Sequence, residues 1–345
     1  MSGPKNRQRM AENAPYSNLE LVNLVDTWPS PSSPSYVTHL ERYYTLQISP
    51  FPEPVGYLAS HFVSRLPLTE KYWTINPTAR TITITSPKET FESRSDVLNT
   101  TLRAGHEAYP TNNIRSLKNW SNELFPLLYP LTREVILELD GCGVDMLGII
   151  NESVFLVAST LGSSPETRKV WVARRAMWKA AWPGMLDCTA GGGLASNETP
   201  LDGIVREAWE EVRLDRAYIR EHAKYVGENR LQLCETEVGE EGCQMQAQHL
   251  FEVELPENMI PEIGDGEVMG VCLLGVDDLK QKMREGEVKP ASCMVWLDWM
   301  IRHGYLTEDN ERDLEEIKRR LKREFTMVGY DEALASREKE ALTEQ

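Results

Sequence analysis

Three glutamates, Glu207, Glu210 and Glu211, lie close together in the segment GGGLASNETPLDGIVREAWEEV, which runs from Gly191 to Val212. On a helix the spacings i, i+3 and i+4 make these side chains neighbours, so their like charges repel. Carboxylate oxygens are the hard ligands that Mg²⁺ and Mn²⁺ prefer, and a bound cation would remove the repulsion. The spacing therefore predicts a divalent-metal site. The alternative is a solvated acidic helix face, which is what most charge runs are.

The helix that would carry these glutamates has strong local start signals. Thr199 is a good N-cap, Pro200 suits the first helical position, and Asp202 completes a T-x-x-D capping pattern. At about 100° per residue, the apolar side chains form one stripe on a side that the glutamates do not occupy. That stripe consists of Leu201, Ile204, Val205, Ala208 and Val212. Arg206 precedes Glu210 by one helical turn and is placed to brace it.

Seven residues in and just after this segment follow a fixed spacing: Gly192, Glu198, Arg206, Glu207, Glu210, Glu211 and Leu214. The spacing resembles the signature of the Nudix hydrolases, G-x5-E-x7-R-E-U-x-E-E-x-G-U, where U is a bulky aliphatic residue. Two positions depart from it. Arg213 stands where the second glycine is expected, and Ala208 is small for its position. Every carboxylate of the signature is retained.

The resemblance implies hydrolysis of a diphosphate linkage with Mg²⁺ or Mn²⁺ as cofactor. It assigns the role of metal ligand to Glu207, Glu210 and Glu211, and adds the Gly191 carbonyl. It assigns catalytic roles to Glu207, Glu211, Arg206 and Glu267. Of these, Arg206 would orient the glutamates, and Glu267, in GDGEVMGV, would assist the metal or deprotonate water. An ordinary loop acid is the alternative interpretation of Glu267.

A pair of cations precedes the glycines. Arg175 and Lys179 in ARRAMWKAAWPGMLDCTAGGG have the spacing of Nudix-fold isopentenyl-diphosphate isomerases, in which such cations hold the diphosphate. Gly192 and Gly193 have no side chain to obstruct a phosphate near the backbone. These four residues are therefore the candidate substrate-binding group. The alternative for the cations is simple exposure at the end of a strand.

The whole chain resembles a narrower group, the fungal and plant Nudix proteins related to thiamine metabolism. The resemblance rests on RRAMWKAAWPGMLDCTAGGGL, on GEVKPASCMVWLDWMIRHGYLTEDN and on a long forward extension. It implies the stand-alone form, without a fused thiamine pyrophosphokinase. The implied substrate is thiamine diphosphate, or its damaged oxo- and oxy-analogues, cleaved to the monophosphate and phosphate.

Three alternatives to this function stay open. One is hydrolysis of another nucleotide-type diphosphate. A second is a Nudix module that binds a diphosphate without cleaving it, although such modules commonly lose glutamates that this chain keeps. A third, suggested by Arg175, Lys179 and Cys188, is isopentenyl-diphosphate isomerisation; it is disfavoured because Cys188 is followed by TAGGGL, which does not suit a catalytic thiol.

The elements expected to position these residues are strands around a central helix. Strand-like runs are VDMLGIIN, SVFLVAST, KVWVARRA, QAQHLFEVEL and EVMGVCLLG, and late helices are VDDLKQKMREG and SCMVWLDWMIRHG. This order predicts an α/β (α+β) fold, a Nudix α/β/α sandwich with a mixed sheet preceded by a small α+β domain. In that first domain, TFESRSDVLNTTLRAGHEA and SLKNWSNELFPLLYPL are expected to be helical. Its tryptophans are expected in the core.

Four ranges follow from these observations. We expect a flexible N-terminus at 1–16, an α+β extension domain at 17–130, a Nudix hydrolase domain at 131–305, and a helical, charged C-terminal tail at 306–345.

Composition limits the partners. The chain has 345 residues and a net charge of -16, which argues against nucleic acid and anionic membranes as partners. A small organic diphosphate is the expected partner, and a homodimer is left open.

The six cysteines are scattered, and the chain has no signal peptide or long apolar run, which indicates reduced thiols in the cytoplasm. The mildly basic opening residues leave mitochondrial import open.

Overall fold

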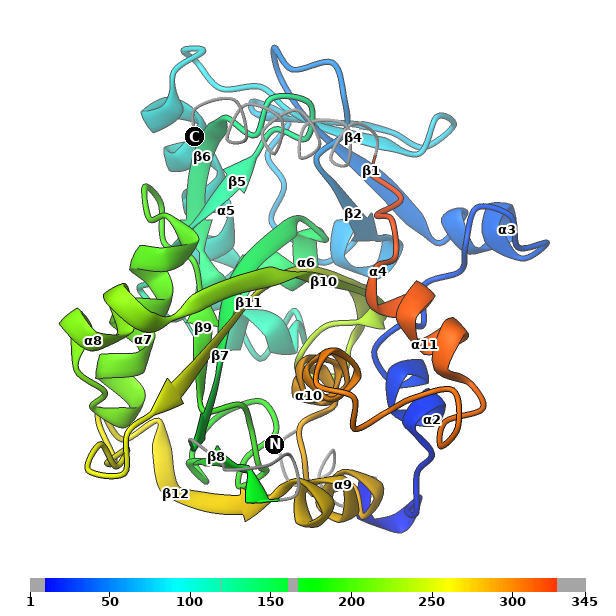
Figure 1. The fold of residues 1–345 in the computed structure, drawn as a ribbon. Helices are drawn as coiled ribbons and strands as arrows, with labels where there is room; N and C mark the ends of the chain where they lie inside the picture. The colour runs from blue at the N-terminus through cyan, green and yellow to red at the C-terminus, as the bar shows by residue number, and fades with distance from the viewer. Residues whose placement is uncertain (1–9, 119, 161–166, 328–345) are drawn as a thin grey trace. The chain divides into compact units, whose positions relative to one another are not determined.

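The computed structural model describes residues 10–118, 120–160 and 167–327 (Figure 1). The chain forms two compact units, each made of segments that are separate in sequence. Unit 1 comprises Met1–Asp26, Glu152–Leu231 and Ala247–Arg323, and unit 2 comprises Thr27–Asn151, Gln232–Gln246 and Glu324–Gln345. The ranges expected from the sequence are continuous, whereas these units are interleaved along the chain.

A six-stranded sheet underlies the candidate site. Its strand order is β10-β11-β7-β8-β12, and β9 also pairs with β7. The strands are β7 (Ile150–Thr160), β8 (Lys169–Arg175), β9 (Ala190–Gly193), β10 (Lys224–Glu235), β11 (Glu241–Leu255) and β12 (Val268–Gly275). The pairings of β8 with β12, and of β7 with β8 and β9, are antiparallel. Together with the helices described below, this sheet confirms the α/β class.

Helix α7 (Pro200–Val212) begins and ends where the local signals predict. The Thr199 side chain accepts a hydrogen bond from the Asp202 N–H at 3.2 Å, and Pro200 occupies the first turn. The apolar stripe is buried: Ile204, Ala208 and Val212 pack in one cluster with alternate residues of β7 and β11. Complete burial of such a side chain stabilises the fold by roughly 1.5–3 kcal/mol. Packing and capping therefore fix α7 on the sheet.

Helices cover both faces of this sheet. Helix α8 (Arg216–His222) shares the core of α7, to which β11 contributes Phe251 and Val253. The Gln248 amide, on the opposite face of β11, donates to the Ala291 carbonyl in α10 (Pro290–Arg302) at 3.2 Å. Since alternate strand residues point to opposite faces, α7 and α10 lie on opposite sides (Figure 1). The three layers are those of the predicted sandwich.

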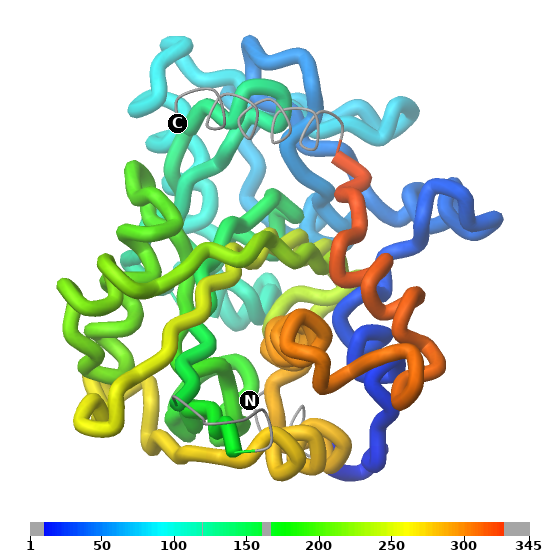
Figure 2. Tube along the Cα trace, viewed as in Figure 1, coloured from blue at the N-terminus to red at the C-terminus, as the bar shows by residue number. Residues whose placement is uncertain are grey.

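The N-terminal segment belongs to unit 1. Met10 is buried, and the Tyr16 N–H donates to the Arg284 carbonyl at the end of α9 (Val276–Arg284). Figure 2 shows this blue segment running beside the orange helices. Met10 and Tyr16 are therefore anchored in unit 1, whereas residues 11–13 and Pro15 are exposed. Residues 1–9 lie outside the described residues.

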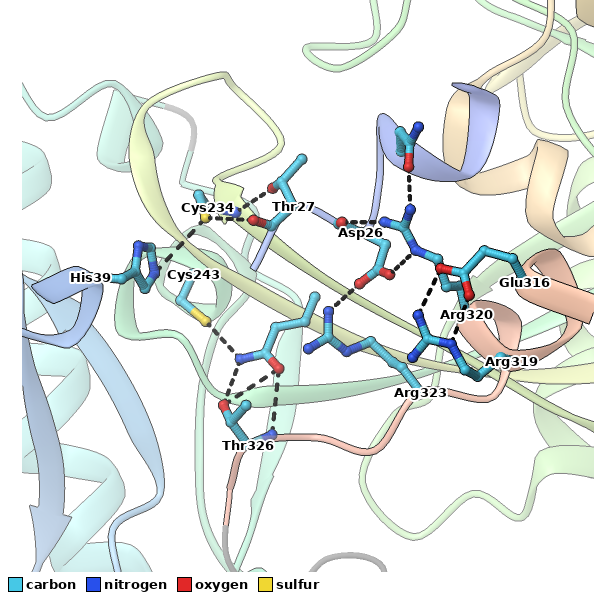
Figure 3. A network of polar contacts seen from close by, with 12 residues as sticks. Asp26, Thr27, His39, Cys234, Cys243, Glu316, Arg319, Arg320, Arg323 and Thr326 are labelled. Atoms are coloured by element: carbon cyan, nitrogen blue, oxygen red, sulfur yellow. Dashed lines mark hydrogen bonds and ion pairs between the residues drawn. The ribbon is translucent and has the colours of Figure 1, made fainter. Parts of the chain in front are cut away.

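Two short helices close unit 1 through a buried ion cluster (Figure 3). They are α2 (Asn18–Asn23) and α11 (Leu314–Leu321). The Asp26 carboxylate, whose side chain is only 9% exposed, pairs with Arg320 at 2.5 Å and also with Arg323. The Arg320 guanidinium also donates to the Asp26 carbonyl at 2.6 Å. The start of the predicted charged tail is thus a packed helix, and residues 328–345 lie outside the described part.

Unit 2 contains a four-stranded sheet of order β2-β1-β4-β3, in which β1 and β4 are parallel. Its strands are β1 (Tyr43–Ile48), β2 (Gly56–Ala59), β3 (Trp73–Asn76) and β4 (Thr81–Ile84); the hairpin β5 (Leu124–Leu128) and β6 (Val135–Asp140) is separate. Its helices are α3 (Tyr36–Leu40), α4 (Ser60–Val63), α5 (Phe91–Glu107) and α6 (Val144–Leu147), with 3-10 turns η1 (Arg115–Lys118) and η2 (Gly141–Gly143). Trp28 and Trp73 are buried, as expected, whereas Trp120 is only partly buried.

Two sequence-based assignments in this region are wrong. The segment 116–131, expected to be helical, forms the end of η1 and strand β5. Pro126 would break a helix but is accepted in a two-stranded ladder, and the Asp140 carboxylate binds the Asn122 N–H at 2.8 Å. The run VDMLGIIN, expected to be a strand, begins as α6, which Gly148 ends in the left-handed conformation at φ 59°.

The cysteines and the helices show two further features. None of the six cysteines, all within the described residues, is in a disulfide. The Cys234 thiol donates to the Thr27 carbonyl at 3.3 Å (Figure 3). Across the residues that the structure describes, no helix has the length and apolar character needed to span a membrane.

Candidate active site

Helix α7 and strand β9 bring the predicted glutamates against the glycines. The Gly191 N–H donates to Glu211 Oε2 at 2.9 Å, and Glu211 is only 8% exposed. A Cβ added at Gly192 would lie 2.1 Å from Glu207 Oε1, so only glycine lets Glu207 approach this strand so closely. Because the N–H and C=O of a strand residue point to the same side, the Gly191 carbonyl also points toward α7.

Arg206 is the hub of the cluster. Its guanidinium forms a bidentate pair with Glu198 at 2.7 and 2.9 Å, and it also contacts Glu207 at 2.7 Å. It reaches Glu210 at 3.2 Å and donates to the Gly193 carbonyl at 3.0 Å. The hydrogen bonds to Glu198 raise the pKa of Arg206, so its charge is permanent. The predicted bracing of Glu210 is present, and the same side chain also fixes Glu198 and Glu207.

Burial dominates the acid–base behaviour of two of the glutamates. It raises the pKa of Glu207 to about 7, even though the neighbouring Arg206 lowers it. Burial also raises the pKa of Glu211 well above its usual range; the charge of Glu207 adds to this effect, and the Gly191 N–H opposes it. These carboxylates resist ionisation because their negative charges are poorly compensated where they lie.

These residues fit a divalent cation. Within the described ranges, no three His, Cys, Asp or Glu side chains already stand as a metal-binding group. Arg206 instead draws the oxygens of Glu207 and Glu210 to itself. A cation would compete with that guanidinium and would supply the charge that buried Glu211 lacks. The donor set, carboxylates with a strand carbonyl, is of the type that Mg²⁺ and Mn²⁺ prefer.

A loop before β12 covers the C-terminal end of α7. The N–H groups of Glu262, Gly264 and Asp265 donate to the carbonyls of Val212, Glu211 and Glu210 at 2.8–2.9 Å. A Cβ at Gly264 would lie 1.7 Å from the Glu210 carbonyl oxygen, which shows how close this approach is. The loop therefore holds Glu267 near the cluster. The charge of Glu267 contributes to the raised pKa values of Glu207 and Glu211.

The two predicted substrate-binding cations are both engaged in ion pairs. Lys179 Nζ lies 2.6 Å from Glu267 Oε2, and Arg175 Nη1 lies 2.9 Å from Asp187 Oδ2. The side chain of Arg175 is only 13% exposed, so the alternative of an exposed cation fails for it. The structure brings Lys179 to the predicted Glu267, but it directs Arg175 to a buried acid.

That buried acid, Asp187, was not among the predicted site residues. Burial opposes its ionisation, but the charges of Lys289 and Arg175 outweigh burial and lower the pKa of Asp187. The Ser292 hydroxyl also donates to it. Its charge reaches Glu211, whose pKa it helps to raise. An acid between Leu186 and Cys188 in an apolar run was the available signal, because buried acids are almost always paired.

Arg213 takes over the conformation expected of the missing glycine. It lies at φ 55° and ψ 25°, the left-handed region, and ends α7. The Leu214 N–H then donates to the Ala208 carbonyl at 3.0 Å. A hydrogen bond that reaches back into the last turn in this way is typical of helices that end in a left-handed residue, usually glycine. Arg213 contacts the Trp209 carbonyl at 3.3 Å. The turn after the helix is therefore preserved without glycine.

Comparison with known proteins agrees with this geometry. Residues 156–294 match the model of the NUDIX domain, and this range contains β8, β9, α7 and the loop of Glu267. This part of the chain is therefore similar to the NUDIX domain, and one of the relatives described next is named a Nudix hydrolase.

Curated relatives come from yeast and a plant. An uncharacterized protein of Saccharomyces cerevisiae is 29% identical over 244 residues, which cover 68% of this chain and 69% of the yeast protein. Nudix hydrolase 20, chloroplastic, of Arabidopsis thaliana is 25% identical over 195 residues, 56% of this chain and 50% of that protein. The chain thus spans about half the length of this plant relative. Among solved structures, a Nudix hydrolase from Alicyclobacillus acidocaldarius is 14% identical with a TM-score of 0.34, covering 43% of this chain and 89% of that one.

Proposed function

We propose that this chain hydrolyses the diphosphate linkage of a small organic diphosphate, with Mg²⁺ or Mn²⁺ as cofactor. The observation that carries the proposal is the cluster of Glu207, Glu210 and Glu211 around Arg206, against the glycines of β9. An ordinary acidic surface would not bury Glu211 at 8% exposure without a cationic partner. The buried cluster thus supports metal-assisted hydrolysis over a solvated helix face.

Each part of the cluster has a distinct task in this proposal. Glu207, Glu210, Glu211 and the Gly191 carbonyl would hold the cation. When bound, it neutralises charge on the bridging and leaving oxygens of the diphosphate. Arg206 keeps the glutamates in place through its bonds to Glu198 and the Gly193 carbonyl. Glu207 takes up the space that the missing side chain of Gly192 leaves, so Gly193 is the proposed position at which a phosphate approaches this backbone.

Glu267 is the proposed proton acceptor for the attacking water. Its Oε2 is bound by Lys179, which leaves Oε1 for the proton. A diphosphate entering the site would attract the same ammonium group of Lys179, because the two carry opposite charges. Lys179 is therefore the proposed substrate cation, whereas Arg175 is paired with the buried Asp187.

The proposed substrate is thiamine diphosphate or an oxidised analogue, cleaved to the monophosphate and phosphate. The support is the resemblance of the sequence to thiamine-related Nudix proteins. A Mg²⁺-dependent screen of thiamine diphosphate, oxythiamine diphosphate, ADP-ribose, NADH and coenzyme A, with phosphate products identified, tests it. Release of phosphate from the thiamine compounds is expected. Activity confined to the nucleotide compounds would discard the thiamine assignment and retain the diphosphatase.

Glu211→Gln tests the carboxylate cluster itself. We expect kcat to fall by roughly 100-fold or more, the scale seen when charge-stabilising groups are removed. The melting temperature should be unchanged or higher, because the variant replaces a carboxyl group whose ionisation is opposed by burial. Glu221→Gln, on the exposed face of α8, is the matched control and should be fully active. Unchanged phosphate release from Glu211→Gln, or its unfolding, would contradict the assignment.

We also propose that the protein acts in the cytoplasm, with mitochondria as the second compartment. The support is the absence of a disulfide among the six cysteines, all of which are described. Fractionation of cells that express the tagged full chain would test the assignment.

A further inference from the structure

A large aromatic side chain stands uncovered beside the candidate site. Trp178 is 67% exposed, yet its indole N–H donates to the Gly266 carbonyl at 3.1 Å. An exposed tryptophan without a bond would be free to change rotamer, whereas this bond restricts the ring to one orientation. The protein therefore presents an oriented apolar ring face to its surroundings.

The hydrogen bond to Gly266 attaches Trp178 to the loop before β12. The next residue in that loop is Glu267, which pairs with Lys179, the neighbour of Trp178, at 2.6 Å. The Ala176 N–H donates to the Glu267 carbonyl at 2.8 Å, so both sides of Trp178 are attached to the same loop. The ammonium of Lys179 lies 5.5 Å from the centre of the indole ring. A phosphate held at Lys179 would therefore place the rest of its molecule next to Trp178.

An apolar side chain close in sequence to Glu267 is exposed as well. Met269, which follows Glu267 by two residues, is 48% exposed. Exposed apolar side chains that gather beside a polar site are typical of ligand-binding surfaces. A flat ring fixed by its edge leaves its face for another ring, because stacking needs only that face.

We propose that Trp178 determines specificity by stacking on the planar ring that the proposed substrate carries. This inference rests on the proposed diphosphatase function and adds a specificity-determining residue to it. A cationic ring gains most, because the indole face attracts positive charge. The diphosphate is held at Lys179 and the cation site, and the ring is held at Trp178.

Steady-state kinetics with Trp178→Ala, Trp178→Phe and Met177→Ala test the inference. The substrate is whichever ring-bearing diphosphate the unaltered protein cleaves fastest, and methylenediphosphonate serves as a competitive inhibitor without a ring. Trp178→Ala should raise KM about 10-fold, in the range of one lost stacking contact, with kcat changed less than KM. Its Ki for methylenediphosphonate should stay within about twofold of the original. Trp178→Phe should recover most of the affinity, and Met177→Ala should behave as the original protein.

The outcomes separate the two proposals. If the unaltered protein cleaves the diphosphate and Trp178→Ala leaves KM unchanged, the stacking inference alone is overturned. If Trp178→Ala weakens methylenediphosphonate as much as the ring-bearing substrate, Trp178 only supports the loop, and the inference is again overturned. If the unaltered protein cleaves no diphosphate with Mg²⁺ or Mn²⁺, the proposed function fails and the inference fails with it.

Discussion

At the scale of single residues, Arg213 shows how a departure from a motif is absorbed. The position after α7 requires φ near 55°, a conformation that costs a residue with a Cβ roughly 1 kcal/mol relative to glycine. Arg213 offsets part of that cost by contacting the Trp209 carbonyl and by lying over the Trp209 ring at 5.2 Å. The turn after α7 therefore requires the left-handed backbone conformation, which glycine adopts most easily and which Arg213 also adopts.

Arg213→Gly should stabilise the protein. The left-handed conformation carries no penalty for glycine, so the free energy of unfolding should rise by about 0.5–1 kcal/mol. Chemical denaturation followed by circular dichroism would measure it. Arg213→Ala is the control, because it removes the same contacts but keeps the Cβ; it should give no gain. Equal changes in the free energy of unfolding for both variants would show that the side-chain contacts of Arg213, and not its backbone conformation, determine the effect.

At the scale of elements, the junction between α7 and the loop before β12 determines where Glu267 lies. Three consecutive carbonyls at the end of α7 are bound by N–H groups of this loop. Helix ends normally leave such carbonyls to solvent or to a cap. Here the loop binds them, so the end of the helix that carries the proposed metal ligands and the position of the proposed base are set by one contact.

Gly264→Ala should damage stability and activity together. The added Cβ would lie 1.7 Å from the Glu210 carbonyl oxygen, a backbone atom that cannot rotate away. The loop must therefore detach, which we expect to cost about 2–3 kcal/mol through lost hydrogen bonds and strain. Thermal unfolding and phosphate release would both be measured. Gly270→Ala, where nothing lies within 4 Å of the new Cβ, is the matched control. A fully active Gly264→Ala would contradict the role of the junction.

How far the sequence predicted the elements depended on whether their causes were local. Helix α7 was predicted from its cap, its proline and its apolar stripe, all within a few residues. Strand β5 was not, because its pairing with β6 depends on contacts across the hairpin that periodicity does not contain. The glutamates were predicted from their spacing. The partners of Lys179 and Arg175 were not, because Glu267 and Asp187 reach them only in the folded sheet.

At the scale of the whole molecule, the layers of unit 1 are connected by polar contacts in addition to apolar packing. The Glu252 carboxylate of β11 accepts from Arg302 and His303, at the end of α10, at 2.8 Å each. Burial alone would raise the pKa of Glu252, but these hydrogen bonds outweigh it and lower the pKa to about 2. The ionised form therefore holds α10 to the sheet.

The acid stability of the fold should reflect this carboxylate. Because the folded pKa lies below the ordinary value, the contribution is fully present above about pH 4.5 and is lost as the pH falls toward about 2. After solvent screening we expect it to be roughly 1–2 kcal/mol. Urea denaturation of Glu252→Gln and the original protein should therefore differ at pH 7 and converge near pH 2. A difference that stays constant with pH would exclude the ionised Glu252 as its source.

The cluster of Asp26 with Arg320 and Arg323 has a consequence for synthesis. Asp26 leaves the ribosome almost 300 residues before its partners. At ordinary translation rates that interval is roughly 15–60 s, during which the apolar side chains of α2 have no α11 to cover them. Unit 1 therefore cannot complete its core during elongation until residue 323 has emerged. Throughout that interval the nascent chain carries α2 without the helix that later covers it.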